Sequence, residues 1–108
     1  MKILHTADWH LGTFRSPVKD GVNLRTEDTK RCLDELIRVA NEEKPDYSLV
    51  SGDIFHVGRL WSDRCCEEII TAIHYIRELA AVSKQVVVMR GTPNHDGSGQ
   101  FNVLSEMF

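Results

Sequence analysis

The sequence lacks a surplus of positive charge and has no long apolar run. Its 13 Lys and Arg residues stand against 16 Asp and Glu, a formal net charge of −3. Proteins that bind nucleic acid or anionic membranes by general electrostatics usually carry a basic surplus, so an anionic ligand would have to be attracted locally. No stretch approaches the roughly 18 apolar residues of a transmembrane helix, and no secretory apolar segment follows Met1. We therefore expect a cytoplasmic protein that does not associate with membranes.

Cysteine is also scarce. Cys32, Cys65 and Cys66 are odd in number and match neither a C-x-x-C motif nor a paired zinc spacing. This pattern argues against a disulfide framework and fits a reducing compartment. Free cysteine behaves as a small apolar residue, so we expect all three to be buried on helices. The 108 residues, 42% of them apolar, are enough for one domain with a core but not for two.

Three short apolar runs predict buried strands at residues 2–6, 47–51 and 85–90. Between them, apolar residues at helical spacing predict helices over 26–43 and 62–82, the first preceded by a loop at 12–25 and the second beginning at a Ser62 cap. Strands that alternate with helices form a parallel sheet through right-handed crossovers. The predicted fold is therefore α/β, a β-α-β-α-β parallel sheet with flanking helices, covered on both faces because the strand runs are continuously apolar.

Two further segments carry apolar residues that the predicted sheet does not account for. The apolar stripe of the second helix is broad, which fits either ordinary core packing or additional contact with another helix or subunit. Residues 100–108 predict an apolar helix that is too short to be stable alone. We therefore expect residues 1–108 to be the amino-terminal portion of a larger domain, completed by the natural protein or by a partner.

Each predicted strand is followed by a polar cluster. Asp8-Trp9-His10-Leu11-Gly12 follows the first strand, Gly52-Asp53-Ile54-Phe55-His56 the second, and Gly91-Thr92-Pro93-Asn94-His95-Asp96 the third. One Asp after a strand is often only a turn former. Three clusters in register are different, because parallel strands bring their carboxyl ends to one edge, where α/β proteins place their sites. Carboxylate, imidazole and amide groups together suit manganese, iron or zinc.

The order D-x-H, G-D-x-x-H and N-H-D resembles the signature of the calcineurin-like metallophosphoesterases. Within that superfamily the first two motifs are most similar to the SbcD-type double-strand-break repair nucleases, and the resemblance covers nearly the whole chain. It implies that the fold is the amino-terminal half of a metallophosphoesterase β-sandwich. It also implies manganese-dependent exonuclease and endonuclease activity on DNA, an SbcC-like ATPase of the SMC type as partner, and a homodimer.

The resemblance also implies roles for individual residues. Asp8 and His10 would bind one divalent metal, Asp53 would bridge two, and Asn94 would bind the second. His95 would be catalytic, hydrogen-bonding the scissile phosphate and protonating the leaving oxygen, a task that suits a group titrating near neutrality.

Several residues admit two interpretations. His56 could position DNA or act as a capping group, and the basic residues Arg15, Lys19, Arg25, Arg59 and Arg64 could contact phosphates or simply be solvated. Asp96 fits a turn former better than a functional residue. His5 and His74 are expected to be structural.

Thr92 and Pro93 separate Gly91 from Asn94, whereas the family motif is a compact G-N-H-D, and the family's later G-H-x-H element is not among these residues. Two alternatives to the nuclease therefore remain: a non-catalytic scaffold with an incomplete metal site, and a phosphatase or small-molecule phosphodiesterase.

Overall fold

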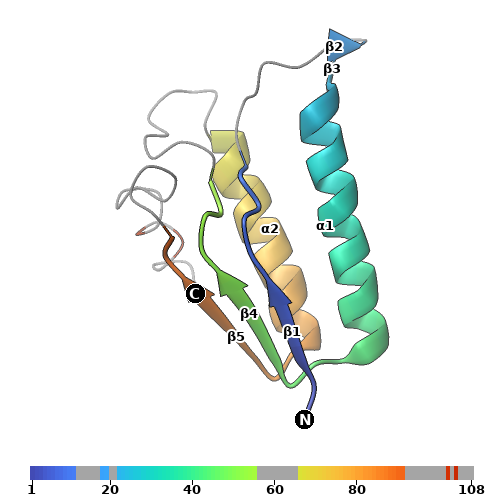
Figure 1. Ribbon diagram of the computed structural model, residues 1–108, viewed down its shortest axis with the longest axis vertical. Helices are drawn as coiled ribbons and strands as arrows, with labels where there is room; N and C mark the ends of the chain where they lie inside the picture. Colours follow the sequence, from blue (N-terminus) through green and yellow to red (C-terminus); the bar gives the residue numbers. More distant parts are fainter. Residues whose placement is uncertain (12–17, 20–21, 56–65, 92–101, 103, 105–108) are drawn as a thin grey trace.

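The computed structural model describes residues 1–11, 18–19, 22–55, 66–91, 102 and 104, which form an α/β fold (Figure 1). Three strands make the main sheet: β1 (Ile3–Thr6), β4 (Tyr47–Ser51) and β5 (Gln85–Met89). Two helices connect them, α1 (Leu24–Glu43) and α2 (Cys66–Val82). The predicted α/β class and the order of its elements are confirmed.

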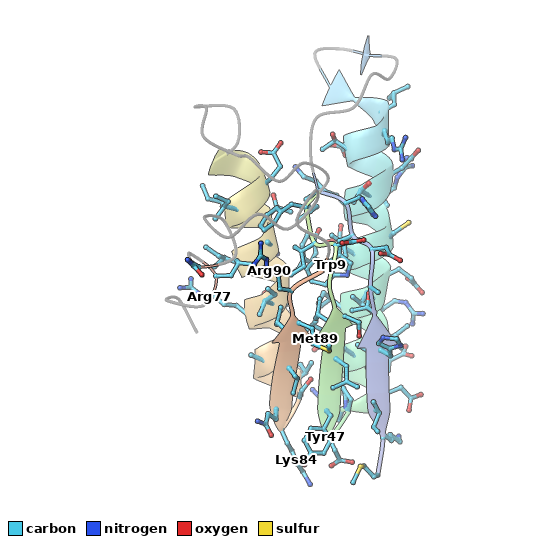
Figure 2. The ribbon with its side chains drawn as sticks, turned by 60° about the vertical axis from the view of Figure 1, so that its left-hand side comes forward. Trp9, Tyr47, Arg77, Lys84, Met89 and Arg90 are labelled. Atoms are coloured by element: carbon cyan, nitrogen blue, oxygen red, sulfur yellow. The ribbon has the colours of Figure 1, made fainter. Side chains whose placement is uncertain are left out.

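The sheet is parallel and has β4 at its centre, in the order β1-β4-β5. Ile3 pairs with Tyr47 and Tyr47 with Gln85, so the three strands start at the same level. Their carboxyl ends consequently meet at one edge, as the sequence predicted. In Figure 2, Tyr47 and Lys84 mark the amino-terminal edge, and Trp9 lies beyond the carboxyl-terminal ends of the strands.

Both helices cover the same face of the sheet (Figure 1). The fully buried residues of this layer include Ala40 on α1, Val50 on β4 and Leu79 on α2. Helix α1 starts two residues before the predicted position and ends as predicted. Its last turn is closed by Lys44, which adopts a left-handed conformation (φ 47°) and is followed by buried Pro45. The predicted Ser62 cap of α2 lies outside the described residues.

The prediction that both faces of the sheet are covered is wrong for the described part of the chain. Ile3, Val87 and Met89 point away from the helices and are 57%, 40% and 59% exposed. The physical reason is the direction of the crossovers. Two successive right-handed connections that step the same way along a sheet place both helices on one face. The apolar strand runs therefore alternate between a covered and an open face.

Two smaller features also differ from the sequence prediction, and a third prediction lies largely outside the described residues. The region predicted as a loop contains a two-stranded antiparallel sheet, β2 (Val18–Lys19) and β3 (Val22–Asn23). Cys32 was predicted to be buried but is exposed, because it lies beside the inward-facing row of α1 rather than in it. The side chains of Cys65 and Cys66 are not described. Of the predicted helix at 100–108, only Asn102 and Leu104 are described, both helical, and Leu104 joins the core.

None of the helices in the described ranges is long and apolar enough to cross a membrane.

Candidate metal centre

The loops that follow β1 and β4 remain joined by backbone hydrogen bonds beyond the ends of the strands. The Asp8 amide donates to the Gly52 carbonyl (3.1 Å), the His10 amide to the Asp53 carbonyl (3.0 Å) and the Leu11 amide to the Ile54 carbonyl (2.8 Å). A parallel bridge between Leu11 and Phe55 closes this region. The two loops thus have a defined register, and their polar side chains are delivered to a common point.

Three side chains converge there: Asp8, His10 and Asp53. Each offers a ligand atom, and these atoms all lie within 4.8 Å of one another. His10 Nε2 is 3.8 Å from Asp8 Oδ1. The Asp8 side chain is 68% exposed and that of His10 30%, so the cluster is accessible from solvent while His10 is partly held by its surroundings.

The backbone at these three residues is unusual. Asp8, His10 and Asp53 have φ values of 56°, 49° and 49°. Among the described residues, Lys44 is the only other non-glycine with positive φ. A non-glycine residue in this region carries strain of order 1–3 kcal/mol, and such residues gather at functional sites where the surrounding structure imposes the conformation. Here the inter-loop hydrogen bonds help to impose it, and three of the four described non-glycine residues with this backbone are the ones that converge.

Two glycines allow the loops to approach this closely. Gly52 has a φ of 86°, and a Cβ on it would lie 2.6 Å from Gly91 Cα. A Cβ on Gly91 would lie 3.0 Å from Asp53 Cγ and would overlap the backbone nitrogen and Oδ1 of Asp53. The third strand-end loop therefore begins directly against the Asp53 carboxylate. In the sequence both glycines are visible only as parts of motifs, because the residues that they pack against follow different strands.

An open groove of about 780 Å³ adjoins the cluster. One wall is the segment from Thr6 to Trp9, which includes Asp8, and the other is the amino-terminal half of α1. Exposed Arg25 and Asp28 line the helix wall together with Cys32. The groove gives an extended ligand a path to Asp8 that bears one positive side chain.

The remaining predicted site residues fall outside the described part of the chain. These are Asn94, His95 and Asp96 with the Thr92-Pro93 insertion, and also His56, Arg15, Arg59 and Arg64. Lys19 is described only in its backbone. Their roles stay predictions.

His5 and His74 were predicted to be structural histidines, and neither belongs to the cluster. His5 is exposed on the open sheet face, with Nε2 2.7 Å from Ser51 Oγ. His74 is also exposed and packs edge-to-face on Tyr75, with ring centroids 4.9 Å apart.

The donor set fits a divalent cation. Two carboxylates and one imidazole match the preferences of manganese, iron and zinc, and a carboxylate such as Asp53 can bridge two cations with its two oxygens. The cluster is close enough for the three ligand atoms to approach one cation. Asp8 is exposed enough to adjust.

Comparison with known proteins agrees with this site. A family model described as calcineurin-like phosphoesterase matches residues 1–107. The chain is 30% identical over its full length to a protein of Staphylococcus epidermidis that is named as the SbcD component of the nuclease SbcCD. It is 31% identical to the protein of the same name from Staphylococcus saprophyticus. In both cases the chain spans 26% of the relative's length.

Proposed function

This chain belongs to the calcineurin-like phosphoesterase family, and we propose that it forms part of a manganese-dependent nuclease that hydrolyses phosphodiester bonds in DNA. The observation that carries the proposal is the convergence of Asp8, His10 and Asp53 on strained turns at one edge of the sheet. The family accounts for hydrolysis of phosphoester bonds by means of divalent metals. The DNA substrate and the choice of manganese are the finer part of the proposal.

In this proposal, Asp8 and His10 would hold one cation, Asp53 would be shared between two, and Asn94 would bind the second. When bound, the cations neutralise phosphoryl charge and activate water for in-line attack. The residues of the chain do the positioning: the left-handed turns aim Asp8, His10 and Asp53 at one point, and Gly91 leaves the Asp53 carboxylate room. His95 would hydrogen-bond the scissile phosphate and give a proton to the leaving oxygen.

DNA is favoured as substrate by two considerations. The relatives from both Staphylococcus species are named as components of a nuclease. In addition, the groove beside Asp8 is open, which suits an extended strand better than a small enclosed ligand; Arg25 on its helix wall can contact a phosphate, and bound cations would offset the carboxylates of Asp8 and Asp28. Arg15 and Arg59, with His56, are proposed to contribute further contacts. If so, binding should weaken steeply with salt.

We propose two protein partners. The relatives' name points to an SbcCD assembly, so we propose an SbcC-like ATPase of the SMC type. We also propose a homodimer that uses α2, because Ile70 projects from this helix with 63% of its surface exposed. Since the chain spans about a quarter of the relatives' length, residues 1–108 are proposed to be the amino-terminal portion of a longer nuclease domain.

Calorimetric titration with Mn²⁺ tests the metal centre directly. We expect the 108-residue chain to bind Mn²⁺ and Asp53→Asn to weaken binding by at least about tenfold, because it removes the shared carboxylate. Asp46→Asn is the matched control, since it makes the same chemical change at the amino-terminal edge of the sheet. Absence of binding to the wild-type chain, or equal effects of the two substitutions, would refute the centre.

Enzyme assays separate the proposed activity from its alternatives. The full-length protein should cleave linear duplex DNA in the presence of Mn²⁺ and should act poorly on a phosphomonoester. The reverse preference would indicate a phosphatase. Two Mn²⁺ sites are expected in the full-length protein, whereas one weak site or none would indicate a non-catalytic scaffold.

A further inference from the structure

Trp9 lies in the chain between two of the converging residues, Asp8 and His10, but its side chain packs into the core. Its side chain is buried, with 6% of the residue exposed, whereas Asp8 on one side is largely in solvent. Figure 2 shows Trp9 just beyond the carboxyl ends of the strands. Because Trp9 is large, buried and flanked by two residues with left-handed backbone, contacts made by its side chain can fix the conformation of the loop.

The Trp9 indole has two defined partners, one for its N–H group and one for its ring. Its Nε1–H donates to Thr6 Oγ1 at 2.8 Å, which ties the loop to the last residue of β1. Its ring meets Tyr75 of α2 edge-to-face, with centroids 6.4 Å apart and planes at 76°. This is a favourable geometry for two aromatic rings.

Tyr75 extends the connection to the other helix. It is 5% exposed, and its hydroxyl donates to Asp34 Oδ1 on α1 at 2.7 Å. The position of the Trp9 ring is therefore set by β1, α2 and, through Tyr75, α1. Because the Trp9 backbone is continuous with Asp8 and His10, fixing the ring also fixes the direction in which its two neighbours project.

We propose that Trp9 is a positioning residue for the metal centre. Trp9 holds Asp8 and His10 in the strained backbone conformation that lets both side chains reach one cation. This inference rests on the proposed metal-binding function. A strained turn returns to ordinary backbone geometry unless its surroundings impose the conformation. The hydrogen bonds from Asp8 and His10 to the β4 loop supply part of that constraint, and Trp9 supplies it between them.

The test compares Mn²⁺ binding with stability in three variants. Trp9→Phe keeps an aromatic ring against Tyr75 but removes the hydrogen bond to Thr6, and Thr6→Val removes the acceptor while preserving its shape. Both should bind Mn²⁺ about tenfold more weakly than the wild-type chain, the lower end of the effect of residues that orient metal ligands. Leu79→Val is the control, because Leu79 is fully buried on α2 toward the far end of the sheet and should alter melting temperature without altering affinity.

The outcomes are distinct. Loss of affinity in Trp9→Phe and Thr6→Val, at a temperature where circular dichroism shows all variants folded, with Leu79→Val unchanged, supports the proposal. A folded Trp9→Phe variant whose affinity for Mn²⁺ is within twofold of that of the wild-type chain overturns it. If Trp9→Phe does not fold, unchanged affinity in Thr6→Val overturns it instead. A wild-type chain that binds no Mn²⁺ refutes the metal centre itself, a result separable from failure of the positioning role.

Discussion

Substituting Gly91 by Ala should disable the metal centre, because the new side chain would displace both the backbone and the carboxylate of Asp53. The new Cβ would overlap the backbone nitrogen and Oδ1 of Asp53 and would lie 3.0 Å from its Cγ, whereas carbon atoms in contact prefer about 3.5–4.0 Å. The Asp53 carboxylate would therefore have to move by about 0.5–1 Å. Metal–ligand distances tolerate only about 0.2 Å, so this displacement removes Asp53 from a productive position.

The expected loss of Mn²⁺ affinity is about 10- to 100-fold, or roughly 1.4–2.8 kcal/mol. Calorimetry measures it on the 108-residue chain. Gly52→Ala is an informative comparison, because its new Cβ would meet the backbone of Gly91 and not Asp53, and because Gly52 has a φ of 86°, which L side chains rarely adopt. We expect both substitutions to lower the melting temperature, Gly91→Ala through its clash with the Asp53 backbone and Gly52→Ala through backbone strain added to its clash with Gly91.

A folded Gly91→Ala chain with wild-type Mn²⁺ affinity would show the reasoning to be wrong. It would mean that Asp53 either relaxes without loss or does not bind the cation. Raising the ionic strength is not expected to restore the Mn²⁺ affinity of Gly91→Ala, because the defect is steric rather than electrostatic.

Three further predictions concern other residues. Burial and the hydrogen bond to Asp34 raise the pKa of Tyr75 above its usual 10.0, so its contribution to stability is present below that pH and is lost as pH rises through the higher value in the folded chain. Tyr75→Phe should lower the free energy of unfolding by about 1–2 kcal/mol at neutral pH and should reduce the loss of stability at alkaline pH. Urea denaturation at pH 7 and above pH 10 would measure both effects. If the variant loses as much stability at alkaline pH as the wild-type chain, Tyr75 is not the group responsible. Ile70→Glu should halve the mass of the full-length protein in light scattering if α2 forms the dimer contact, whereas the same mass would place the contact elsewhere. His95→Ala should abolish DNA cleavage while Mn²⁺ binding persists, and loss of the metal instead would make His95 a ligand.

Much of the fold follows from local patterns that sequence alone carries. Apolar residues at helical spacing identified α1, and the stop at Lys44-Pro45 was predicted correctly because proline restricts the residue before it. Parallel pairing followed from the alternation of strands and helices. The same rule put the polar clusters after β1 and β4 at one edge. The resemblance to the metallophosphoesterase motifs singled out Asp8, His10 and Asp53 within those clusters, and the structure brings these three side chains together.

Other features depend on contacts between distant residues. Ile70 and Cys32 both lie on amphipathic helices and are exposed. Whether such a residue faces the core depends on how its helix is rotated against the sheet. The hairpin of β2 and β3 consists of two-residue strands, too short to show a periodic pattern. The open sheet face depends on the side to which each crossover turns, and apolar strand composition does not record that choice.

Sequence by itself determined which chemical groups stand at the strand ends, because residue type and order along the chain are enough to specify a carboxylate, an imidazole or a glycine. Only the tertiary structure decided their mutual geometry: the left-handed turns, the burial of Trp9 against Tyr75, and the fit of Gly91 to Asp53. These contacts join residues from different strands and helices. Their distances follow from how all the elements pack at once, and no local stretch of sequence contains that information.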